Sequence, residues 1–131
     1  MTDDVVITGL GAITPLGGDV ASTWEAVLAG RSGITAIAEP WAADIAVRIA
    51  GRMAVDPSAS LPKAQARRMD RSQHAALAAA QQAWADAGFS GRAEDNGLDP
   101  TRVAVVIGTG IGGVVSLIDQ YDVMLAKGAS K

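Results

Sequence analysis

Two short apolar runs, far apart along the chain, predict buried strands. The first is the β-branched run Val5–Thr8, which Gly9 closes, and the second is Arg102–Ile107, which Gly108 closes. After its arginine the second run is apolar throughout, a pattern typical of strands that are buried on both faces. A weaker alternation over Ile45–Ile49 indicates a further short strand.

Three longer segments carry the composition and the end signals of helices. Asp19 is the predicted N-cap of the first helix, in which Trp24 and Leu28 share one face. The second helix is rich in alanine, so we expect it to approach other backbones closely. Each helix ends close to a glycine, the residue most suited to a helix C-terminus. The predicted helices are Val20–Ala29 before Gly30, Ala64–Ala87 before Gly88, and Val114–Leu125, which stops near Gly128.

The order strand, helix, helix, strand, helix favours the α/β class, with helices layered around a largely parallel sheet. The two clear strands are too few for a stable sheet. We therefore expect a chain cut short, and its end at Lys131, just after a helix, agrees with this.

Composition narrows the possible chemistry. The chain has 131 residues, the size of one domain, and no cysteine, so it holds no disulfide scaffold, thiolate metal site or cysteine nucleophile. The lone histidine, His74, cannot build a zinc site. A net charge of −3 argues against general nucleic-acid binding. The acidic start lacks an export signal and no apolar run is long enough to span a membrane, so we expect a cytoplasmic protein.

Glycines at 108, 110 and 113 form a G-x-G-x-x-G pattern between the second predicted strand and the last helix. Such a loop can bind a dinucleotide, because glycines admit a close backbone approach and a helix N-terminus attracts anions. The acidic residue expected about 20 positions later has no counterpart, since Asp119 and Asp122 come too soon. A tight turn that requires glycine for packing is therefore favoured.

Two further features have a functional and a structural interpretation. His74 could serve as a general base, but it lies within a predicted helix without a partner, so an ordinary helical histidine is favoured. Lys63, Arg67, Arg68 and Arg71 form a basic cluster in an acidic chain. This cluster could attract an acidic partner or be an ordinary solvated helix start, and composition alone does not separate the two.

Several segments together resemble the β-ketoacyl-acyl-carrier-protein synthases, type II condensing enzymes with the thiolase-like fold. Their order and spacing match the family across nearly the whole chain. The matching segments are Val5–Gly17, Ser22–Trp24 with Leu28–Ile34, Arg67–Asp70, and Ile107–Gly113. The stretch Asp44–Ile49 is also similar to synthases that extend long, mycolic-type acyl chains.

The resemblance implies the layered αβαβα fold, of which residues 1–131 would be an N-terminal part with an incomplete, mainly parallel sheet. It implies a parent acyltransferase that condenses acyl and malonyl thioesters on acyl carrier protein, as a homodimer without metal or cofactor. The family's cysteine and two histidines would lie beyond Lys131, so the chain by itself is expected to be inactive. A non-catalytic relative that keeps only carrier-protein binding or dimerisation is the alternative.

The resemblance also assigns roles to particular residues. Lys63, Arg67 and Arg68 match the region that receives the acidic carrier protein, and Lys131 matches a second basic contact. Ile111 matches the residue that gates the acyl pocket. It stands between Gly110 and Gly112, so its side chain can swing at little backbone cost. Core filling is the structural alternative for Ile111.

Overall fold

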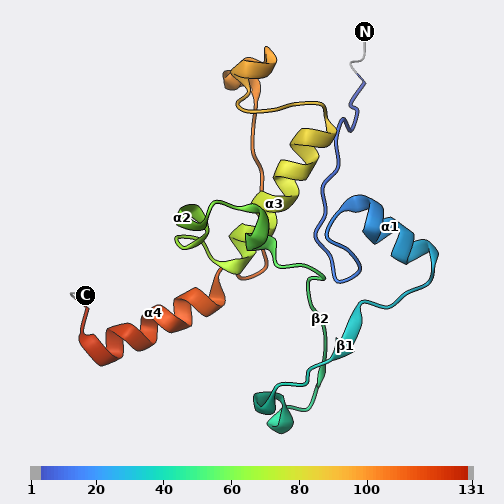
Figure 1. Ribbon diagram of the computed structural model, residues 1–131. Helices are drawn as coiled ribbons and strands as arrows, with labels where there is room; N and C mark the ends of the chain where they lie inside the picture. Colours follow the sequence, from blue (N-terminus) through green and yellow to red (C-terminus); the bar gives the residue numbers. More distant parts are fainter. Residues whose placement is uncertain (1–3, 130–131) are drawn as a thin grey trace.

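A computed structural model describes residues 4–129, and α3 is its central element (Figure 1). The chain order begins with a helix and a two-stranded ribbon, continues through short helical turns into α3, and closes with α4. The helices are α1 (Val20–Leu28), α2 (Lys63–Ala66), α3 (Arg71–Asp86) and α4 (Val114–Lys127), and the strands are β1 (Ile34–Ala36) and β2 (Ile49–Gly51). Short 3₁₀ helices are η1 (Pro40–Asp44), η2 (Pro57–Ser60), η3 (Glu94–Asn96) and η4 (Pro100–Arg102).

Local signals set both ends of α1, as predicted. The Asp19 carboxylate accepts the Ser22 backbone N–H at 2.7 Å, and the Ser22 hydroxyl accepts the Asp19 N–H at 3.3 Å, which forms a capping box. At the other end Gly30 takes a φ of +64° and donates its N–H to Val27. This left-handed turn satisfies carbonyls that the helix itself leaves free.

The predicted helix over Ala64–Ala87 is two helices, because Asp70 interrupts it. The Asp70 carboxylate accepts the N–H groups of Ser72 and Gln73 at 2.7 and 3.1 Å, and so starts α3 afresh. The Gln73 side chain completes the capping box by accepting the Asp70 N–H at 3.0 Å. The C-terminal end was predicted correctly, with Gly88 at a φ of +81°.

The N-terminal extended segment packs directly on the alanine-rich face of α3, as the composition predicted. A Cβ atom on Gly9 would lie 2.7 Å from the Ala87 nitrogen, and one on Gly11 would lie 2.7 Å from the Ala83 nitrogen. Both would also overlap backbone carbonyl oxygens of α3. Only glycine allows this backbone-to-backbone contact.

Two polar side chains of α3 bind the backbone of the same N-terminal segment. Asp86 accepts the Leu10 N–H at 2.8 Å, and Gln82 accepts the Ala12 N–H at 3.1 Å. Gln82 also donates to the Gly18 carbonyl at 2.8 Å. These bonds take the place of part of a strand ladder, and they hold the segment in register on the helix.

The predicted mainly parallel sheet is not confirmed. Within residues 4–129 the only sheet is the antiparallel pair β1 and β2, in which Thr35 lies opposite Ala50. The predicted strands Val5–Thr8 and Arg102–Ile107 form no ladder, and Val106 is 92% exposed. Arg102 itself is the last residue of η4. The first run leads into Gly9 and Gly11, which pack on the C-terminal half of α3, whereas Val105 and Ile107 line a groove along its N-terminal half, so the two runs do not meet to form a ladder (Figure 1).

Small residues dominate the buried core, and much of the apolar surface is left open. Ala26, Ala42, Leu61 and Ala78 are buried, as is Pro57 at the start of η2. By contrast α4 projects away from the other elements (Figure 1). It leaves apolar side chains exposed, among them Val115, Leu117 and Leu125. No helix among residues 4–129 is both long and apolar enough to cross a membrane.

Candidate functional site

The basic cluster lies on the surface where α2 turns into α3. Lys63 opens α2, Arg67 is its C-cap, and Arg68 follows in the turn. The Arg67 N–H donates to the Lys63 carbonyl at 3.2 Å, which keeps these two residues on one turn of helix. All three side chains are exposed, and Arg71 is exposed one position into α3.

None of these four cations forms a salt bridge in the part of the chain that the structure describes, although hydrogen bonds from Ser58 and the nearby charge of Arg71 lower the pKa of the Asp56 carboxyl. The ion pair found there joins Arg52 to Glu39, in the region of the two-stranded ribbon. Arginines held in internal ion pairs would serve to fix the helix start. The cluster instead presents free positive charge to solvent, which is what an acidic binding partner requires. Lys131 lies outside the described residues.

The glycine loop, residues 108–113, needs glycine at two positions for two different reasons. Gly112 has a φ of +77°, and its N–H donates to the Thr109 hydroxyl at 2.9 Å. Gly113 has a φ of −82° and a ψ of 61°, an inverse γ-turn closed by the 3.0 Å bond from the Val114 N–H to the Gly112 carbonyl. Its requirement for glycine comes from a neighbour, Asp70.

Ile111 stands at the tip of this loop and is 81% exposed. Gly110 before it has open space around its Cα, whereas Gly112 after it is fixed by its left-handed backbone. The Ile111 side chain therefore fills no core within the described residues.

An apolar groove runs between α3 and the extended segment that leads into the glycine loop. Its volume is about 910 Å³, and its walls are almost entirely apolar. The floor comes from α3 and the opposite wall from Val105 and Ile107. The lining residues are Gln65, Met69, Ser72, Gln73, Ala75, Ala76, Leu77, Ala80, Val105, Ile107, Gly108 and Thr109. The groove thus joins the region of the basic cluster to the start of the glycine loop.

Asp70 is a site residue that the sequence interpretation did not single out. It lies inside the basic cluster, between Arg68 and Arg71, caps α3, and touches the glycine loop at Gly113. Hydrogen bonds from the Ser72 hydroxyl and the Gln73 backbone N–H hold the pKa of the Asp70 carboxyl below its usual value. The spacing of Asp70 and Gln73 is that of a capping box, and this pattern was the available signal.

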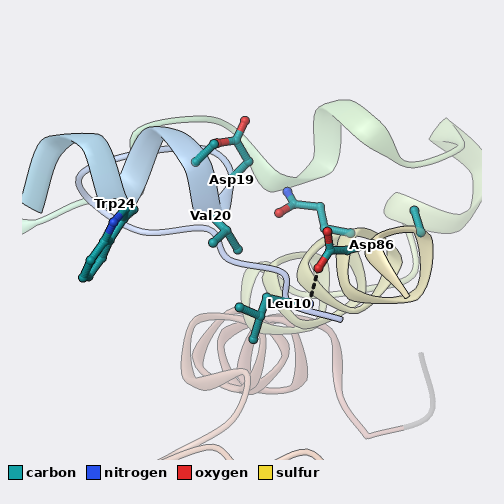
Figure 2. A pocket seen from close by; sticks show the side chains of 8 residues that line it. Leu10, Asp19, Val20, Trp24 and Asp86 are labelled. Atoms are coloured by element: carbon teal, nitrogen blue, oxygen red, sulfur yellow. Dashed lines mark hydrogen bonds between the residues drawn. The ribbon is translucent and has the colours of Figure 1, made fainter. Parts of the chain in front are cut away.

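A second hollow lies between the start of α1 and the C-terminal half of α3 (Figure 2). Leu10 and Asp86 meet there through the hydrogen bond described above, and Trp24 reaches in from α1. None of the predicted site residues lines this hollow. Its carboxylates serve the backbone, since Asp86 holds Leu10 and Asp19 caps α1, so it is a structural feature of the α1–α3 packing.

His74 is an ordinary structural histidine, as favoured from the sequence. Its Nε2 lies 2.8 Å from the Ala66 carbonyl oxygen, so the ring ties the last turn of α2 to α3. Within residues 4–129, no group of three His, Cys, Asp or Glu side chains is placed to hold a metal ion.

Comparison with known proteins gives one consistent result. Residues 2–130 match the family model described as β-ketoacyl synthase, N-terminal domain. The chain is 42% identical over 128 residues to 3-oxoacyl-[acyl-carrier-protein] synthase 2 of Synechocystis sp., which covers 97% of this chain and 30% of that protein. It is 39% and 36% identical, at the same coverage, to the proteins of that name from Coxiella burnetii and Vibrio cholerae. The chain thus spans about 30% of the length of these relatives.

Proposed function

Because the chain belongs to the β-ketoacyl synthase family, through that family's N-terminal domain, we propose that it forms part of a 3-oxoacyl-[acyl-carrier-protein] synthase of fatty-acid biosynthesis. The observation that carries this proposal is the identity of 36–42% to synthases of one name over nearly the whole chain. Membership of this family also argues against the dinucleotide-binding interpretation of the glycine loop.

The proposed reaction is a decarboxylative condensation. The acyl group passes from its carrier protein to a cysteine thiolate, which forms a new thioester and releases the carrier thiol. Malonyl carrier protein then loses carbon dioxide, and the resulting carbanion attacks the acyl thioester and expels the cysteine. The cysteine and the pair of histidines that assist it are not among these 131 residues, which contain no cysteine and one histidine.

Within this reaction the basic cluster would dock the carrier protein. The support is the exposed, unneutralised charge of Lys63, Arg67 and Arg68. Carrier proteins of this class are acidic, so opposite surface charges would steer their encounter. Lys131 is proposed as a further basic contact.

The glycine loop would bind the acyl substrate, with Ile111 as the gate between Gly110 and Gly112. Its exposed position in the loop that follows Thr109, which lines the apolar groove, supports this role, because an acyl chain is apolar and enters from solvent. The finer proposals are a long-chain or mycolic-type substrate, action in the cytoplasm and a homodimeric enzyme. A non-catalytic relative that keeps only carrier-protein binding or dimerisation is the second candidate.

The test is a pair of substrate titrations on the complete synthase, with Arg67 and Arg68 both changed to glutamate. Exposed charges act mainly on association and are screened by salt. The KM for acyl carrier protein should rise about 30-fold at low salt, which corresponds to about 1 kcal/mol for each of the two reversed charges. The kinetics with a small acyl thioester, which presents no protein surface, should change little.

A matched control changes Arg92 and Arg102 to glutamate. Both are exposed, neither forms an ion pair among the described residues, and the net charge changes equally. This variant should leave both titrations near the wild type. Equal losses with both substrates in the Arg67→Glu, Arg68→Glu variant, unaffected by salt, would refute the docking role.

A further inference from the structure

The side chain of Asp70 joins two parts of the molecule that the proposed function treats separately. One carboxylate oxygen, Oδ1, accepts the Ser72 N–H, the Ser72 hydroxyl and the Gln73 N–H at 2.7, 2.6 and 3.1 Å. The other, Oδ2, faces Gly113, the last residue of the glycine loop. Asp70, which lies within the basic cluster, therefore also touches the loop that carries Ile111.

This contact is close enough to decide which residue can occupy position 113. A Cβ atom on Gly113 would overlap Oδ2 and would lie 2.6 Å from Cγ of Asp70. The backbone angles at Gly113 suit any residue, so the restriction comes from Asp70 alone. Asp70 cannot easily swing away, because three hydrogen bonds hold its other oxygen.

Among residues 4–129, no side chain caps the start of α4 through a hydrogen bond. Gly113 is the N-cap residue there and supplies no side-chain hydrogen bond, in contrast to Asp19 at α1 and Asp70 at α3. The start of α4, and with it the end of the glycine loop, is thus located by packing against a carboxylate that another helix immobilises.

We infer that Asp70 is a positioning residue for the acyl-binding loop: its immobilised carboxylate fixes Gly113, and through it the segment that carries Ile111. The expected effect on catalysis rests on the proposed function, whereas the contact between Asp70 and Gly113 does not depend on it. Asp70 touches no reacting atom, so its effect on the reaction is indirect.

The test is a double-mutant cycle on the complete synthase, with Gly113→Ala and Asp70→Ser alone and combined. Serine is a good N-cap, so α3 stays capped while the oxygen that blocks position 113 is removed. Gly113→Ala alone should lower kcat about tenfold and lower the melting temperature. In the Asp70→Ser background the same change should cost little in either measurement.

Two further variants separate shape from charge and from general stability. Asparagine keeps the shape of Asp70, so Gly113→Ala should remain costly in the Asp70→Asn background. Asp19→Ser makes the same exchange of one good N-cap for another at α1, where the Asp19 side chain caps on Ser22, and it should be additive with Gly113→Ala.

Additive effects of Asp70→Ser and Gly113→Ala on both melting and kcat would overturn the inference, as would a melting effect without any change in kcat. A Gly113→Ala protein that folds only in the Asp70→Ser background would support the contact. If the synthase shows no condensing activity but the melting cycle is coupled, the proposed function fails and the Asp70–Gly113 contact stands.

Discussion

Substitution of alanine for Gly11 tests whether backbone contact with α3, and not turn geometry, explains the N-terminal glycines. The new Cβ would lie 2.7 Å from the Ala83 nitrogen and would overlap the Ala79 carbonyl oxygen. Backbone atoms of a helix cannot rotate aside, so the whole segment must move. The backbone at Gly11 is not left-handed, so the cost comes from this contact alone.

The magnitude follows from what that movement disturbs. Overpacking of a close contact costs about 1–3 kcal/mol. The shift also displaces the Leu10 and Ala12 N–H groups from Asp86 and Gln82, and each hydrogen bond is worth about 1 kcal/mol. Together these give a loss of about 3–5 kcal/mol in the free energy of unfolding, or roughly 3–6 °C in melting temperature for a complete protein about three times as long as this chain.

The assay is thermal melting of the complete protein, followed by circular dichroism. The control is Gly30→Ala, since Gly30 has a φ of +64° and open space around it. That control should cost only the backbone strain, about 1–2 kcal/mol. A loss at Gly11 no larger than the loss at Gly30 would refute the close-packing explanation.

Two further predictions concern acid stability and the isolated chain. Hydrogen bonds from the Ser22 side chain to Asp19, and from the Ser72 side chain to Asp70, lower the pKa of both carboxyls. Their contribution to stability is therefore present above the pKa of the unfolded chain and is lost as the pH falls through the lower folded pKa. The Asp19→Asn and Asp70→Asn variants should each be less stable than the wild type at pH 7, and this difference in unfolding free energy should shrink below about pH 4. A difference that stays the same from pH 7 to pH 3 would contradict this. Residues 1–131 alone, incubated with acyl and malonyl carrier proteins, should release no carbon dioxide or ketoacyl product, because they contain no cysteine and one histidine; turnover comparable to a complete synthase would show the expectation wrong.

The sequence predicted the separate elements of the candidate site, but it did not predict the contacts between them. The cation cluster at Arg67 and Arg68 was visible as composition, and the loop around Ile111 as a glycine pattern. Their exposure agrees with the roles that the family resemblance implies, which remain proposals. The contact of Asp70 with Gly113 could not be found in this way, because no local pattern indicates that two distant segments meet.

Local chemistry explains what the sequence by itself determined. Asp19 and Gly30 set the ends of α1 because a cap and a left-handed glycine act on backbone groups within one helical turn. The same reasoning placed the end of α3 before Gly88. Family membership was equally readable, since it rests on the order and spacing of motifs along the chain.

Only the tertiary structure decided whether the apolar runs pair as strands and which glycines are required by their neighbours. Val5–Thr8 has the composition of a strand, but pairing needs a neighbouring backbone, and this segment runs into the part of the chain that lies against α3. Gly11 and Gly113 look like turn glycines in the sequence, yet they are required by Ala79 and Asp70. Such requirements depend on atoms brought together from distant positions, and steric exclusion between them exists only once the chain has folded.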